Sequence, residues 1–220
     1  MSFKILFADE LKGFYKSKVM IVLWVGLPLL SLLFHYITPN TEGFPISSIV
    51  AIILSSVGGT LASAMLSTSI ASEKLRHVYD LYLIRPVKRT NILLAKYFSV
   101  YLCLIIATGI SLTLGLILDQ IFIGNLPEYV LNQTIESLTI SMAAMAISCS
   151  IGVFFGILVS SVPVATILSV YIGNQISAIS ILPTVFLDFI DPVIFSLIIG
   201  PIAAVIMLTV SSILFSRKQF

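Results

Sequence analysis

Six long apolar stretches constrain this chain more than any other feature of its sequence. An α-helix rises about 1.5 Å per residue, so about 20 apolar residues cross the ~30 Å hydrocarbon core of a bilayer. Strands of a membrane barrel would need runs of about ten residues in which polar and apolar side chains alternate. The stretches here are apolar throughout, and we therefore predict an all-α membrane protein with six transmembrane helices in one domain over residues 1–220. The expected spans are residues 19–37, 48–70, 97–118, 134–159, 163–185 and 193–215.

The composition agrees with a chain whose solvent is mostly lipid. Hydrophobic residues make up 58% of the sequence and charged residues only 10%, against about 45–50% and about 25% in soluble domains. This balance excludes a soluble globular domain, a disordered chain and a disulfide-rich secreted scaffold. Cys103 and Cys149, the only cysteines, lie inside apolar stretches without metal-ligand spacing, and we expect them to be small buried residues.

The positive charges predict the orientation of the chain. All twelve lysines and arginines lie before the first span, between the second and third, or after the sixth. They are Lys4, Lys12, Lys16, Lys18, Lys74, Arg76, Arg85, Lys88, Arg89, Lys96, Arg217 and Lys218. With six spans these segments share one side, which the positive-inside rule assigns to the cytoplasm. We therefore expect a plasma-membrane protein with both termini and the basic loop in the cytoplasm. Asp119 and Glu136 fall at outer helix ends, where ordinary solvation would account for them.

Residues 1–17 predict an amphipathic helix that lies in the cytoplasmic interface of the membrane. At about 100° per residue, one face carries an apolar group and the opposite face carries charges, with Glu10 intruding near the apolar side. The apolar group is Phe3, Phe7, Leu11 and Phe14, and the charged group is Asp9, Lys12 and Lys16. The aromatic face would then enter the headgroup layer. The alternative is a polar tail that only fixes the topology.

The basic loop over residues 72–89 predicts a cytoplasmic docking element. Ser72 can cap a short helix that runs to about Ile84. Arg85 precedes Pro86, which disfavours helical geometry at Arg85 and forces a break. Residues 81–84 read Leu-Tyr-Leu-Ile. The alternative interpretation is a solvated loop that only fixes the topology, but such a loop does not need four large apolar or aromatic residues in a row.

The same loop resembles the segment between the second and third spans of ATP-binding-cassette transporter permeases of the type-2 export class. The shared pattern is Glu-Lys-x-Arg-x-x-x-acidic-Leu-x-Leu-x-x-Pro-Val-x-Arg, followed by Ile-Leu-Leu-x-Lys at residues 92–96. That family often has Gly-Thr where this chain has His77-Val78. The resemblance implies a coupling helix that docks on an ATPase subunit. The residues it assigns to this coupling are Glu73, Arg76, Asp80, Leu81, Arg85, Pro86 and Arg89.

The resemblance also implies the partners and the function. The chain would be the permease subunit of an ATP-driven exporter, with ATP and Mg²⁺ bound by a separate cytoplasmic ABC ATPase. A second permease copy or a paralogue would complete the translocation path within the membrane lipid. Between the last two spans, the family tends to have a re-entrant hairpin. Residues 183–192 fit such a hairpin, and they fit a plain outer loop nearly as well.

Small residues recur every four positions on two of the expected spans. They are Ser55, Gly59, Ser63 and Ser67 on the second span, and Ala144, Ser148, Gly152 and Gly156 on the fourth. Such stripes allow helices to approach closely, which we favour over the lining of a path. Asn174 and Gln175 lie near mid-depth of the fifth span, where an amide needs a partner or water. The possible path residues are Ser55, Gly59, Ser63, Asn174 and Gln175.

Missing motifs narrow the function further. The sequence has no G-x-x-x-x-G-K-[ST] phosphate loop, no H-E-x-x-H and no G-x-S-x-G, so we expect no catalytic residue, no metal site and no cofactor on this chain. No nucleic-acid partner is expected either. The alternatives to the permease are an ATP-independent carrier or a small-molecule-binding membrane subunit. A membrane enzyme is disfavoured because the spans lack paired acids, metal ligands or a nucleophile with a base.

Overall fold

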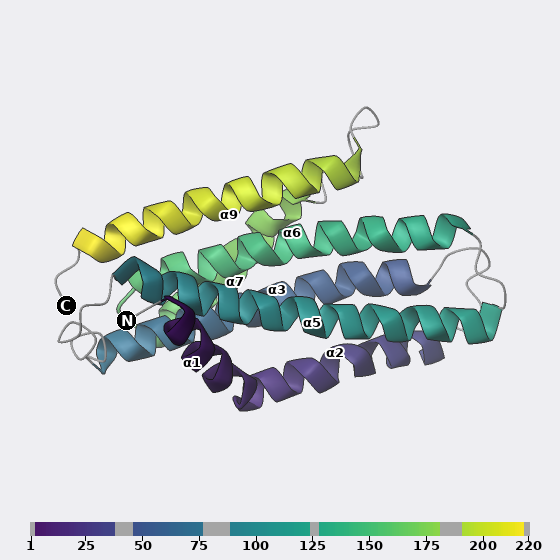
Figure 1. The fold of residues 1–220 in the computed structure, drawn as a ribbon, viewed down its shortest axis with the longest axis horizontal. Coiled ribbons are helices and arrows are strands. Elements are labelled where there is room, and N and C mark those ends of the chain that lie inside the picture. The colour runs from purple at the N-terminus through teal and green to yellow at the C-terminus, as the bar shows by residue number, and fades with distance from the viewer. Residues whose placement is uncertain (1–2, 38–45, 77–88, 124–127, 181–190, 218–220) are drawn as a thin grey trace.

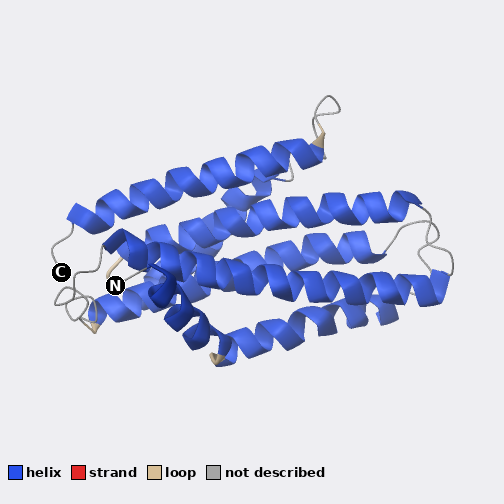
Figure 2. Ribbon diagram, in the orientation of Figure 1, coloured by secondary structure: helices blue, strands red, loops and turns tan. Residues whose placement is uncertain are grey.

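The computed structural model describes residues 3–37, 46–76, 89–123, 128–180 and 191–217, and these segments are helical with short connections and no strand (Figure 2). The helices are α1 (Phe3–Tyr15), α2 (Lys18–Ile37), α3 (Ile46–Leu75), α5 (Arg89–Ile123), α6 (Glu128–Leu158), α7 (Val162–Ser177) and α9 (Pro192–Arg217), with a 3₁₀ turn η1 (Ala178–Ser180) after α7. The long helices run along a common direction in one bundle (Figure 1).

Several of these helices are long and apolar enough to cross a membrane. Four satisfy this criterion within the described residues: Thr90–Ile121, Asn132–Leu158, Val162–Ser180 and Pro192–Ser216. A fifth span results if the bent pair Phe3–Tyr15 and Met20–Leu33, whose axes differ by 62°, is counted as one. The chain is therefore a helical, multi-pass membrane protein, with four helices, or five if the bent pair is one span, long and apolar enough to cross a membrane where six spans are expected.

Helix α6 forms the centre of the bundle. Within its apolar stretch 89% is buried inside the protein, against 22% for α7 and for α9. Helices α3, α7 and α9 all pack on α6, so their outer faces are left for lipid or for a partner. The exposed face of α9 carries large aliphatic side chains such as Ile198 and Ile202, which suits contact with hydrocarbon.

The two small-residue stripes face each other between α3 and α6. A Cβ placed on Gly152 would lie 2.7 Å from the backbone oxygen of Ser63, and one on Gly59 would lie 3.0 Å from Ser148 Oγ. A Cβ on Gly156 would lie 3.2 Å from the Cα of Ser67. The helices approach this closely because the facing side chains are so small.

Helices α6 and α7 form the tight hairpin that Pro163 indicates. Helix α6 ends at Leu158 and α7 begins at Val162, with Ser161 as the N-cap in extended geometry. The proline falls in the first turn of α7, where its missing N–H leaves no helical hydrogen bond unmade. The Nζ of Lys74 on α3 donates to the carbonyl of Ile157 at 3.3 Å, which satisfies one of the free carbonyls at the end of α6.

Two local expectations prove wrong. Ser72 does not begin a new helix, because α3 continues to Leu75 and the Ser72 hydroxyl donates to the Ser69 carbonyl at 2.9 Å. Asp119 is not solvated at a helix end, because α5 continues to Ile123 and leaves Asp119 with no exposed surface. In both places the helix extends beyond the apolar stretch from which its end was inferred.

Candidate functional site

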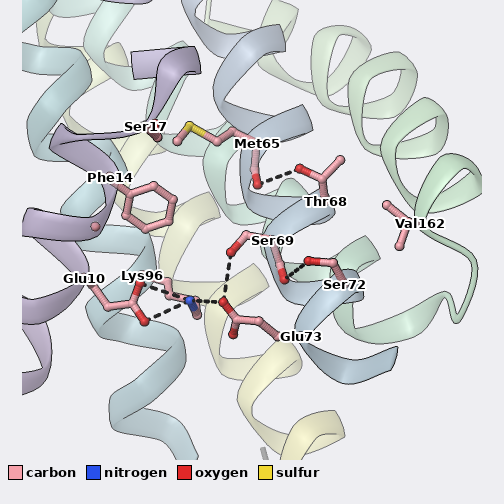
Figure 3. Close-up of a pocket in the computed structure, with 11 residues that line it drawn as sticks. Glu10, Phe14, Ser17, Met65, Thr68, Ser69, Ser72, Glu73, Lys96 and Val162 are labelled. Carbon is pink, nitrogen blue, oxygen red and sulfur yellow. Dashed lines mark hydrogen bonds and ion pairs between the residues drawn. The ribbon is translucent and has the colours of Figure 1, made fainter. Parts of the chain in front are cut away.

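Three charged side chains from three helices meet where α3 ends and α5 begins. The Nζ of Lys96 on α5 lies 2.9 Å from Oε1 of Glu10 on α1 and 2.6 Å from Oε1 of Glu73 on α3. Figure 3 shows the ammonium between the two carboxylates. The Lys96 side chain is only 3% exposed. We call Glu10, Glu73 and Lys96 the ion triad.

Helical spacing explains why α1 and α5 place charges in the interior. Glu10 lies four residues from Leu6 and four from Phe14, so it shares a stripe with these two side chains, which are the two buried ones on α1. Lys96 likewise lies four residues after Ile92 and four before Val100, which are both buried. Each charged residue is thus carried into the interior by its apolar neighbours.

Helix α1 packs on the bundle through this stripe. The Ser99 hydroxyl on α5 donates to the Phe7 carbonyl at 3.5 Å, in addition to its 2.7 Å bond within α5. The ring of Phe14 lies 5.8 Å from Lys96 Nζ, a distance at which a cation and an aromatic ring attract. The aromatic face expected in the headgroup layer is therefore partly used for packing against α5.

The triad carries one more negative than positive charge when all three groups are ionised. The Ser69 hydroxyl donates to Glu73 Oε1 at 3.2 Å, whereas Glu73 Oε2 is buried without a hydrogen-bond partner. Burial raises the pKa of the Glu10 carboxyl above its usual range, and the attraction of Lys96 opposes this shift. Because Lys96 is ion-paired with both Glu10 and Glu73, its ammonium holds both carboxylates in place.

A cavity of about 420 Å³ adjoins the triad. Its walls come from α1 and the residues after it, from the last turns of α3, and from the starts of α5 and α7 (Figure 3). The lining residues are Glu10, Gly13, Phe14, Ser17, Met65, Thr68, Ser69, Ser72, Glu73, Lys96 and Val162. We call this space the α1–α3 cavity.

The residues assigned to ATPase coupling fall partly on described helices. Glu73 lies in the last turn of α3 as a member of the triad, and Arg76 follows that helix with an exposed side chain. Arg89 is the first residue of α5, and its side chain lies outside the described part. Asp80, Leu81, Arg85 and Pro86 also lie outside the described residues, as does the 183–190 part of the possible hairpin.

The possible path residues do not come together around one space. Gly59 and Ser63 are buried in helix contacts, since Gly59 faces Ser148, and Ser63 faces both Gly152 and Gly173. Asn174 and Gln175 follow Gly173 on α7 and are exposed on the surface of the chain. The side chain of Ser55 is not described. Within one chain, the small residues of α3 thus serve the packing of helices.

The triad was not predicted from the sequence, although two signals for it were present. Glu10 intrudes on the apolar side of α1, and Lys96 directly precedes an apolar stretch. Neither signal indicates which acid meets which base, because the partners are 86 and 23 residues apart. Among the described residues, no three His, Cys, Asp or Glu side chains gather as metal ligands.

Fold and site together define a multi-pass helical membrane protein with a buried ion triad at one end of its bundle. In a comparison with known proteins, no family model matches the chain, and no curated protein matches it significantly.

Proposed function

We propose that the chain is the permease subunit of an ATP-driven exporter of the type-2 ATP-binding-cassette class. In this proposal six spans cross the plasma membrane and both termini lie in the cytoplasm. A separate ATPase binds the coupling segment over residues 72–89, and a second permease copy or a paralogue completes the translocation path. The proposal begins from the resemblance of residues 73–96 to the coupling segment of that family.

One structural observation carries the proposal: the ion triad joins the start of this segment to the helix that follows it. Glu73 lies at the start of the segment and Lys96 lies beyond its end, and their side chains are 2.6 Å apart. Glu10 adds α1 to the same contact. A displacement imposed on the loop would therefore move the ends of α3 and α5 together instead of opening the space between them.

Helices α3 and α5 suit the transmission of such a displacement. They are continuous over 30 and 35 residues, and α3 packs closely on α6 through the small-residue stripes. A closing ATPase dimer would bias the equilibrium between two arrangements of the spans, provided that the loop contacts the ATPase differently in each of them.

The path itself is proposed to lie between two permease subunits. The side chains of Asn174 and Gln175 are exposed on α7, and an amide exposed to hydrocarbon costs free energy unless it finds a partner or water. A hydrated path along α7 would supply water, and a second subunit against α7 would supply a partner. The substrate would be weakly polar or amphipathic, because no charged residue accompanies these amides on α7.

The first test is copurification of the full chain from mild detergent with an ATPase, followed by measurement of ATPase activity in proteoliposomes. Reversing both charges with Arg85→Glu and Arg89→Glu is expected to abolish cargo-stimulated ATP hydrolysis while membrane insertion persists. Lys12→Glu with Lys16→Glu, two exposed cations of the N-terminal region, is the matched control and should keep the stimulation. Unchanged stimulation in the loop variant would count against docking.

A second variant tests the apolar part of the contact. Leu81→Asp is expected to release the ATPase during purification, because a carboxylate in a docking groove would be desolvated without a partner. Retention of the complex would contradict the assignment of Leu81. The alternative, an ATP-independent carrier or small-molecule-binding subunit, predicts that the isolated chain moves or binds its cargo without any ATPase.

A further inference from the structure

The α1–α3 cavity has the size and the mixed lining of a small-molecule site. Its volume of about 420 Å³ falls within the range of about 300–1,000 Å³ that is typical of ligand pockets. Phe14, Met65 and Val162 are the large apolar residues of the lining. The polar lining consists of the ion triad and the hydroxyls of Ser17, Thr68, Ser69 and Ser72.

The hydroxyl oxygens of the lining offer hydrogen-bond acceptors. The hydroxyl protons of Thr68, Ser69 and Ser72 are already donated, respectively to Ala64, Glu73 and Ser69. Each of these oxygens keeps lone pairs that can still accept. Ser17 Oγ accepts the Met20 N–H at 3.2 Å, and it retains a second lone pair. A ligand with several N–H donors therefore matches this lining.

The charge at the cavity selects the same kind of ligand. Lys96 is shared by two carboxylates, so one negative charge stays uncompensated when the triad is ionised. Glu73 is one of the lining residues, so the excess negative charge of the triad lies at the wall of the cavity. Free phosphate, which brings no ammonium group, would instead be repelled by this charge.

We propose that the α1–α3 cavity binds the primary ammonium group of an amphiphilic molecule. The ammonium donates to the hydroxyl oxygens that line the cavity and is attracted by the excess negative charge of the triad, while the apolar part contacts Phe14 and Met65. The ligand is an ethanolamine phospholipid of the bilayer or a soluble alkylamine, which share this chemistry. The proposal does not rest on the exporter function, because binding is measured on the chain without an ATPase.

The test titrates octylamine, which is protonated at pH 7, into the full chain in maltoside micelles. Binding is followed by the fluorescence of Trp24, the single tryptophan. Its ring lies 5.8 Å from that of Tyr15, the residue that follows the cavity residue Phe14 in the sequence. Octanol has the same apolar chain without the charge and should bind at least about tenfold more weakly, since hydrogen bonds to charged groups contribute about 1.5–3 kcal/mol.

Three variants distinguish the site from partition into micelles. Glu73→Gln is expected to raise the dissociation constant of octylammonium about tenfold, whereas Asp9→Asn, an exposed acid on α1, should leave it unchanged. Gly13→Leu keeps the triad intact and adds a side chain where a Cβ meets nothing within 4 Å, which should block the cavity. Equal affinity for octanol and octylammonium, or unaltered binding in both Glu73→Gln and Gly13→Leu, would overturn the proposal.

Lipid nanodiscs then assign the source of the ammonium. If phosphatidylethanolamine weakens octylammonium binding relative to phosphatidylcholine, the cavity holds a membrane lipid. If the two lipids give the same octylammonium affinity, the site binds a soluble amine. Octylammonium binding that is absent in both nanodiscs would reject the site in a bilayer.

Discussion

Lys96 Nζ lies 2.6 Å from Glu73 Oε1, although these residues are 23 positions apart in the sequence. The contact joins the end of α3 to the start of α5, and the approach of Glu10 from α1 makes Lys96 the shared partner of two acids. Two carboxylates this close repel each other in the absence of the ammonium. The stability of this end of the bundle should therefore depend strongly on Lys96.

Lys96→Met is expected to lower the free energy of unfolding by about 2–3 kcal/mol. Removal of one partner of a buried ion pair leaves an uncompensated charge, which costs about 3–5 kcal/mol in fully buried pairs. We expect less here because the side chains of Glu10 and Glu73 are 16% and 24% exposed. The measurement is unfolding by denaturing detergent, with Lys12→Met on the exposed face of α1 as the control. A triple variant that adds Glu10→Gln and Glu73→Gln should recover much of the loss; equal loss in the triple variant would show that packing, not charge, is responsible.

Gly152→Ala is expected to destabilise the bundle by about 1–3 kcal/mol, the usual effect of excess volume in a packed interior. The new Cβ would lie 2.7 Å from the backbone oxygen of Ser63, and a backbone atom cannot move aside without separating α3 from α6. Gly109→Ala on α5 is the matched control, since its Cβ meets nothing within 4 Å. It should stabilise by about 0.5–1 kcal/mol, because alanine favours helix. The measurement is the thermal unfolding midpoint in detergent. Midpoints that shift in the same direction in both variants would contradict the close contact.

Ser169→Ala tests the hydrogen bond between α7 and α3. The Ser169 hydroxyl lies 2.8 Å from Ser67 Oγ and is fully buried. Interhelical hydrogen bonds of this kind contribute about 0.6 kcal/mol on average in membranes, so we expect a loss of about 0.5–1 kcal/mol in detergent unfolding. Ser216→Ala is the control, because Ser216 is exposed and bonds only the Ile213 carbonyl of its own helix. Equal effects from the two substitutions would argue against a specific contribution of the α3–α7 bond.

Cysteine labelling provides a test of the expected orientation. Cys103 and Cys149 are 2% and 0% exposed, so a maleimide should not label the folded wild-type chain. Arg76→Cys places a thiol at an exposed position after α3. A membrane-impermeant maleimide should label this variant in inside-out vesicles but not in intact cells. Labelling in intact cells would place residue 76 outside and reverse the proposed topology.

The sequence was sufficient for several features that depend on residues close together in the chain. The long apolar stretches indicate helices of membrane-spanning length, and Pro163 indicates the start of α7 after a short turn. The four-residue repeat of small side chains predicts close helix contacts, because that spacing places them on one face. It could not predict that Gly152 would face Ser63, since each stripe could have met any other helix.

The tertiary structure alone decided how the charges are paired. From the sequence, Glu10 was an exception on an apolar face, Lys96 a topological signal and Asp119 a solvated acid. Packing brings Glu10 and Glu73 to Lys96 and buries Asp119 completely. Helical periodicity determines which side chains share a face of one helix, whereas the choice of facing helix depends on contacts between residues as much as 86 positions apart. The local sequence pattern therefore specified the helices, and the packing of the whole bundle created the site between them.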